Sequence, residues 1–172
     1  SNAPSGCTIQ TKSVGYTEPG SGQRYNFYDT AGLYEGTEGR VDRRLAIKQL
    51  IILLKQLEQL SLVMYVRKCE ARSLIDDKSI DIIRLITGDK VPCICVNTHA
   101  ENEYFLGQWW QNAKEQMTRI YGFDGGASVV CGESRNPLLN DTLVEKREES
   151  RIILWHLIRT HMLSTPLKII EN

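Results

Sequence analysis

Residues 62–96 read LVMYVRKCEARSLIDDKSIDIIRLITGDKVPCICV, and this stretch decides the fold class. It opens with a short apolar run at 62–66 and closes with another at 91–96, as expected of strands covered on both faces. Between them, 73–86 repeats apolar residues at helical spacing until Gly88 ends the pattern. Strands that alternate with helices in this way predict an α/β fold with a mostly parallel sheet.

The flanking sequence continues this alternation on both sides. Upstream, two strands form a hairpin around a Gly/Pro/Ser turn at 19–22, and a glycine-rich loop at 29–39 leads into a helix. The further predicted strands are 7–17, 23–28 and 127–131, and the further predicted helices are 40–60, 109–121 and 141–162. The predicted order is β-β-α-β-α-β-α-β-α, in a single domain over 4–172. Residues 1–3 resemble the scar left by cleaving an affinity tag and are not counted in that domain.

The composition excludes some classes of protein. With 172 residues, the chain is long enough to bury a full core in one domain. Its 21 Lys and Arg residues balance 21 Asp and Glu residues, so no net charge attracts nucleic acid or an anionic membrane. No apolar run approaches the roughly 18–20 residues of a membrane span. We therefore expect no nucleic-acid partner and no transmembrane segment. A cytoplasmic location is a separate expectation.

Cysteine spacing bears on metal and redox chemistry. The five cysteines are Cys7, Cys69, Cys93, Cys95 and Cys131. Cys93 and Cys95 stand two apart in an apolar run, where alternation puts both thiols on one face of a strand. A zinc or redox pair would call for a second Cys/His pair, and none accompanies them. We interpret both as buried strand thiols in a reducing compartment.

The loop after the second predicted strand carries a candidate phosphate and metal site. It reads Asp29-Thr30-Ala31-Gly32, at the point where a sheet of this class binds its ligands. A carboxylate there can hold Mg²⁺ directly or through water, and a glycine lets backbone N–H groups approach a phosphate. An Asx-turn that only ends the strand is the alternative. The glycine-rich loop and helix that follow favour the phosphate interpretation.

Two further loops follow predicted strands and could read a base. In 97–103 (NTHAENE), a carboxylate can accept two hydrogen bonds from the N1–H and N2–H₂ edge of guanine, and an imidazole can stack on the base. A polar loop with a helix cap is the alternative there. In 131–134 (CGES), backbone groups could contact the base. By contrast, 145–151 (EKREESR) is interpreted as a solvated helix face with charge pairs one turn apart.

Taken together, these residues resemble the guanine-nucleotide-binding domains of the P-loop GTPases. The stretch 28–33 (YDTAGL) is similar to the DxxG element of that class. The stretch 98–101 (THAE) is similar to the base-reading motif in the branch of septins, plastid import receptor GTPases and immunity-associated GTPases. The stretch 101–110 (ENEYFLGQWW) is most like uncharacterised fungal G-domain proteins. The resemblance covers about 6–163.

The resemblance implies a fold and a set of site residues. The fold would be a Ras-like three-layer sandwich with a mostly parallel sheet and one antiparallel hairpin, and the ligands GTP or GDP with Mg²⁺. Thr8, which takes the switch I position, and Asp29 would serve the metal, and Gly32 would serve the γ-phosphate. The guanine would contact Thr98, His99, Glu101, Cys131 and Gly132.

Two departures from the family pattern matter. No G-x-x-x-x-G-K-[ST] motif occurs, and the family's first strand, P-loop and first helix have no counterpart in this chain. Leu33 stands where small Ras-type enzymes have a water-orienting glutamine. Hydrolysis should therefore be slow, should depend on a P-loop supplied upstream, and should be absent from this chain alone. A sheet without its central strand exposes edges, so we expect a homodimer, a strand-exchanged oligomer or a rearrangement.

Two functions follow from these observations. In the first, the full-length protein binds GTP and acts as a nucleotide-dependent switch or assembly module for a protein effector. In the second, the domain is a pseudo-GTPase, a protein-interaction module that has lost the nucleotide. The DTAG and THAE elements favour the first, and the missing P-loop favours the second.

Overall fold

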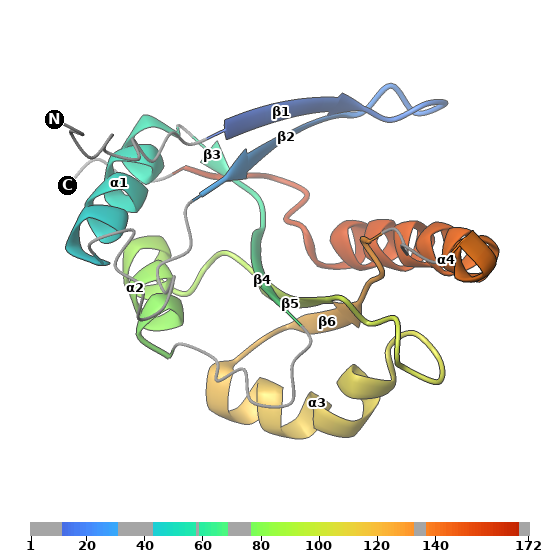
Figure 1. Cartoon of the computed structure of the whole chain (residues 1–172). Coiled ribbons are helices and arrows are strands. Elements are labelled where there is room, and N and C mark those ends of the chain that lie inside the picture. Colours follow the sequence, from blue (N-terminus) through green and yellow to red (C-terminus); the bar gives the residue numbers. More distant parts are fainter. Residues whose placement is uncertain (1–11, 31–42, 58, 69–76, 133–136, 169–172) are drawn as a thin grey trace, which may run out of the picture. The chain divides into compact units, whose positions relative to one another are not determined.

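The computed structural model describes residues 12–30, 43–57, 59–68, 77–132 and 137–168 (Figure 1). The chain forms two compact units. The first comprises Ser1–Glu58 and Ile169–Asn172, and the second comprises Gln59–Lys168. The structure is mixed α/β, as predicted, with a parallel sheet and two antiparallel strand pairs. The single domain predicted over 4–172 stays a prediction.

The first unit contains a hairpin and a helix. Strands β1 (Lys12–Thr17) and β2 (Arg24–Asp29) pair antiparallel with Tyr16 opposite Tyr25, as the alternating sequence predicts. The Gly22 amide donates to the Glu18 carbonyl at 3.1 Å and closes the turn.

The helix of this unit is shorter than predicted. Helix α1 spans Arg43–Gln56 and buries Leu53 and Leu54. The prediction of a helix over 40–60 was wrong at its carboxyl end, because Gln59–Leu60 forms strand β3 instead. That strand belongs to the second unit and pairs antiparallel with β7 (Leu167–Lys168), which was not predicted.

A three-stranded parallel sheet organises the second unit. Its strands are β4 (Val63–Lys68), β5 (Cys93–Thr98) and β6 (Gly125–Ser128), in the order β4-β5-β6. The crossover segments contain α2 (Asp77–Thr87) and α3 (Gln108–Tyr121), and α4 (Pro137–His161) follows β6. The apolar runs predicted as strands at 62–66 and 91–96 are β4 and β5, each displaced by one or two residues.

Two glycines in β6 show which helices cover which face. A Cβ on Gly125 would lie 2.5 Å from His161 Nε2 of α4, and a Cβ on Gly126 would overlap the Trp110 ring of α3. Adjacent strand residues point to opposite faces, so α3 and α4 cover opposite faces of the sheet at β6. The strand predicted over 127–131 overlaps β6 at Ala127 and Ser128 but was placed too far toward the carboxyl end, because Gly125 and Gly126 belong to the strand and admit close helix packing.

The main core lies on the α3 face. Cys93 and Cys95 of β5 share a cluster with Ile80, Met117 and Phe123. Both thiols are therefore buried on one strand face, as predicted. Burial raises the pKa of each thiol to about 12, with Arg84 opposing the shift at Cys93.

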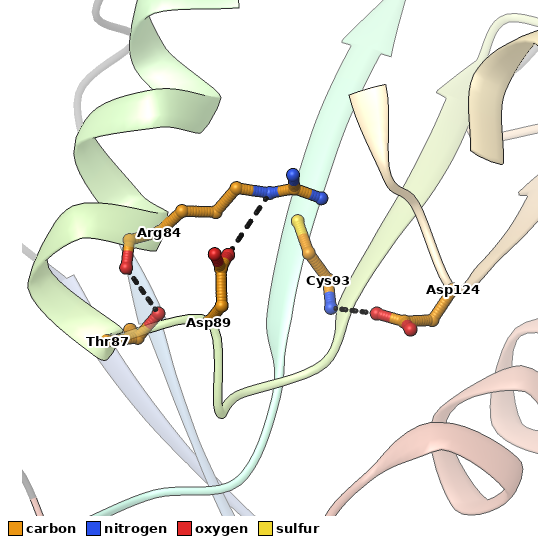
Figure 2. A network of polar contacts seen from close by, with 5 residues as sticks. All are labelled: Arg84, Thr87, Asp89, Cys93 and Asp124. Carbon is orange, nitrogen blue, oxygen red and sulfur yellow. Dashed lines mark hydrogen bonds and ion pairs between the residues drawn. The ribbon is translucent and has the colours of Figure 1, made fainter. Parts of the chain in front are cut away.

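Polar contacts fix the amino end of β5 (Figure 2). The Cys93 amide donates to Asp124 Oδ2 at 2.8 Å, and the Asp124 amide donates back to the Cys93 carbonyl at 2.9 Å. Nearby, Arg84 Nε lies 3.7 Å from Asp89 Oδ1, and the Thr87 hydroxyl donates to the Arg84 carbonyl. The Cys93–Asp124 pair lies at the end of the sheet opposite to the one where the predicted base-reading loops lie, and the other two contacts lie at the end of α2.

Candidate functional site

The two predicted base-reading loops meet at the carboxyl ends of β5 and β6. The Val129 amide donates to the Asn97 carbonyl at 2.7 Å, and the Ala100 amide donates to the Val129 carbonyl at 3.3 Å. These bonds extend the pairing of the two strands beyond their regular ends. The residues after β5 therefore lie against the residues after β6, as expected for neighbouring parallel strands.

Glu101 faces the main chain of the second loop. Its side chain is half-buried, and a Cβ added to Gly132 would lie 3.6 Å from its Oε1. Partial burial raises the pKa of the Cys131 thiol, and the Glu101 carboxylate raises it further. No described residue hydrogen-bonds the Glu101 carboxylate, so both of its oxygens can accept from a ligand.

Glu103 carries the second carboxylate of the same loop, and both of its oxygens accept hydrogen bonds from other parts of this unit. Its Oε1 accepts from the Ser128 hydroxyl at 2.7 Å, and its Oε2 accepts from the Gly107 amide at 3.0 Å. Gly107 is the N-cap residue of α3, so Glu103 joins β6 to the start of that helix. Of these two carboxylates, Glu101 is the one that no described residue hydrogen-bonds.

His99 is presented to solvent by a strained backbone. It is exposed and has φ 61°, in the left-handed region that few non-glycine residues adopt. The Thr98 hydroxyl donates to the Arg67 carbonyl at 3.1 Å, so its oxygen is left to accept from His99 Nδ1 at 3.0 Å. This pattern assigns the proton of the neutral imidazole to Nδ1, with Nε2 as the acceptor.

Asn97, at the end of β5, carries an unsatisfied amide. Its side chain is 1% exposed, and neither Oδ1 nor Nδ2 has a hydrogen-bond partner among the described residues. It stands between Arg67 of β4 and Ser128 of β6 in the register of the sheet. An unpaired buried amide costs about 1–3 kcal/mol, so this position carries a penalty beside the candidate site.

Of the predicted phosphate and metal residues, the structure describes Asp29, which belongs to the first unit. Asp29 is exposed at the end of β2 in the other unit, in register with Lys12. Thr8 and Gly32 lie outside the described residues. Within the described ranges, no three His, Cys, Asp or Glu residues gather as a metal site would need. The described helices also include none that could cross a membrane.

Helix α4 contributes residues that sequence reasoning missed. Lys146, Arg147 and Ser150 all hydrogen-bond the main chain of the two loops. The prediction of a solvated face over 145–151 was therefore wrong at these three positions. The signal was their spacing: Lys146 and Ser150 share a stripe with the apolar Leu143 and Ile153, which pack on the buried Ala100 and Val130.

The chain was compared with known proteins. No protein-family model matches it, and no curated protein matches it significantly in sequence. The resemblance to P-loop GTPases therefore stays a prediction.

Proposed function

We propose that this chain is a Ras-like, guanine-nucleotide-binding domain that acts as a nucleotide-dependent switch or assembly module. The observation that carries the proposal is the Glu101 carboxylate. It has no hydrogen bond from the described residues and faces the main chain of Cys131 and Gly132 at two adjacent strand ends. The parallel order β4-β5-β6, with helices on both faces at β6, supports the Ras-like assignment.

The chemistry of Glu101 suits guanine rather than adenine. Guanine offers two neighbouring donors, N1–H and N2–H₂, that both oxygens of one carboxylate can accept. Adenine offers an unprotonated N1 at the same edge, which would repel a carboxylate. Exposed His99 would cover one face of the base, and the main chain at Cys131 and Gly132 would contact its rim.

The remainder of the nucleotide would be held by the other predicted residues. Asp29 and Thr8 would serve Mg²⁺, and Gly32 would serve the γ-phosphate. Mg²⁺ would neutralise phosphate charge and hold the phosphates in place. No step of hydrolysis is assigned to a residue of this chain.

The second candidate is a pseudo-GTPase that keeps the fold as a protein-interaction module. The absence of a G-x-x-x-x-G-K-[ST] motif from these 172 residues favours it. A P-loop supplies much of the phosphate contact in this class, so its absence removes a main source of nucleotide affinity.

Titration with a fluorescent GDP analogue, with and without Mg²⁺, separates the two candidates. We expect saturable binding that GDP displaces at far lower concentration than ADP does, weakened by both Glu101→Ala and Asp29→Ala. Glu115→Ala, which removes an exposed carboxylate from α3, is the matched control and should bind as the wild type does. No binding up to about 1 mM, which corresponds to about 4 kcal/mol, would reject nucleotide binding and leave the interaction module.

A further inference from the structure

Lys146 of α4 binds the main chain of the loop that carries Glu101. Its Nζ donates to the Glu101 carbonyl at 3.0 Å and to the Glu103 carbonyl at 3.1 Å, and the side chain is half-buried. Hydrogen bonds from a charged donor are roughly twice as strong as neutral ones. Two carbonyls of one short segment can converge on one ammonium only when that segment is folded back.

The same segment is closed by a turn of its own. The Glu103 amide donates to the Ala100 carbonyl at 3.1 Å, so residues 100–103 form a turn. The carbonyls of Glu101 and Glu103 in this turn both accept from Lys146. Lys146 binds the main-chain oxygen of Glu101, and the Glu101 carboxylate lies toward Gly132. The ammonium thus bonds the backbone of this segment and not the Glu101 carboxylate.

Two neighbours on α4 hold the other loop in the same way. Arg147 Nη1 donates to the Gly132 carbonyl at 3.0 Å, and Ser150 Oγ accepts from the Val130 amide at 2.9 Å. Ser150 Oγ also donates to the Lys146 carbonyl at 2.7 Å. This buried side chain therefore links the Val130 amide to the main chain of α4. Helix α4 therefore hydrogen-bonds both the residues after β5 and the residues after β6 that make up the candidate base site.

We propose that Lys146 is a positioning residue that holds the 100–103 turn in the one arrangement in which Glu101 can read guanine. This inference rests on the proposed function. It gives a role to a residue that the sequence pattern predicted to be solvated. A carboxylate must meet N1–H and N2–H₂ together, and displacements of about 1 Å are enough to lose such paired contacts. Adenine makes no use of Glu101, so its weak binding should not depend on Lys146.

The test compares Lys146→Met, Lys146→Arg and Lys114→Met. Lys114 is exposed on α3 and serves as the matched control. Competition of GDP and ADP against a fluorescent GDP analogue gives the guanine preference of each variant. We expect Lys146→Met to lose about tenfold or more in GDP affinity with ADP affinity unchanged. Lys146→Arg keeps a cationic donor and should retain most of the preference, and Lys114→Met should retain all of it.

A second measurement does not require a nucleotide. Hydrogen exchange of the Ala100 and Glu103 amides should be faster in Lys146→Met and unchanged in Lys114→Met, because the turn loses its outer bonds. If Lys146→Met does not fold, Lys146→Gln replaces it with the same criteria. Equal GDP-to-ADP ratios in Lys146→Met and Lys114→Met would overturn the proposal. If the wild type binds no nucleotide, the proposed function fails, and the exchange rates alone decide whether Lys146 holds the turn.

Discussion

The Ser128 hydroxyl of β6 donates to Glu103 Oε1 at 2.7 Å, which joins the end of one strand to the loop after its neighbour. Ser128 is fully buried, and the other oxygen of Glu103 accepts from the Gly107 amide. The Ser128–Glu103 hydrogen bond distinguishes Glu103 from Glu101, the other carboxylate of the loop. Both oxygens of Glu103 accept hydrogen bonds, whereas the Glu101 carboxylate has none from the described residues. The proposed guanine site depends on that division.

Removing the Ser128 hydroxyl tests the structural half of this division. Ser128→Ala leaves Glu103 Oε1 without its donor in a part-buried setting, which should lower the free energy of unfolding by about 1–3 kcal/mol. Urea denaturation followed by circular dichroism measures this. Ser164→Ala removes an exposed hydroxyl from the same unit and is the control. Equal midpoints for the two variants would mean that the Ser128–Glu103 bond contributes nothing to stability.

Asn97 gives a prediction of the opposite sign. Asn97→Leu replaces an unpaired buried amide with an apolar side chain of similar size, so the free energy of unfolding should rise by about 1 kcal/mol or more. The same urea experiment measures the change. A loss of stability would show that the amide is satisfied in solution, for example by an ordered water, and would contradict its unpaired state.

The thiols of Cys93 and Cys95 predict a dependence of stability on alkaline pH. Burial raises the pKa of both from 9.0 to about 12. Between these values the unfolded chain loses thiol protons and the folded chain keeps them, so the unfolded state gains stability. The stabilisation is complete below pH 9.0 and falls as the pH rises toward about 12, by about 1.4 kcal/mol per pH unit for each thiol.

The measurement for this prediction is urea denaturation as a function of pH. Other groups titrate in the same range, so the slope must be compared with that of a double variant, Cys93→Ala with Cys95→Ala. This variant is less stable overall because of the lost packing, and its stability should fall less steeply with pH. Parallel slopes in the two proteins would disprove the link to these thiols.

Cys131 reports on occupancy of the candidate site. Its residue is exposed, whereas Cys93 and Cys95 are buried, so iodoacetamide should modify Cys131 and spare the other two in the folded chain. A guanine held against the main chain of Cys131 and Gly132 would cover the thiol. Saturating GDP should therefore slow modification of Cys131 several-fold, and ADP should not. Peptide mapping by mass spectrometry gives the rate, and an unchanged rate with GDP would argue against a base at this position.

Much of the sheet could be predicted because β4 and β5 each begin with a continuous apolar run. The runs at 62–66 and 91–96 indicated β4 and β5 from composition alone. Strand β6 was misplaced because Gly125 and Gly126 are typical of a turn. Their lack of side chains is instead a packing requirement, imposed by α3 on one face and α4 on the other. Local sequence does not reveal this packing requirement, because it comes from side chains of α3 and α4.

The site could be predicted in part for a similar reason. The stretches 98–101 and 131–132 follow strands, and the rule that ligands bind at carboxyl strand ends placed them together correctly. Lys146 was missed because charged residues on a helix are usually solvated. Its binding to two carbonyls 43 and 45 positions away follows from how α4 packs on the loops. The pairing of β1 with β2 was readable from local sequence, whereas the partners of α4 were not.

The most direct test of the guanine site is the base preference of Glu101→Gln. Xanthine keeps the N1–H of guanine and has a carbonyl oxygen in place of its N2 amine. A carboxamide accepts from N1–H and donates to that oxygen, whereas a carboxylate cannot donate. Competition of GDP and xanthosine diphosphate against a fluorescent GDP analogue should show that the wild type prefers GDP and that Glu101→Gln prefers xanthosine diphosphate. An unchanged preference for GDP in Glu101→Gln would contradict the assignment of Glu101 as the residue that reads the base.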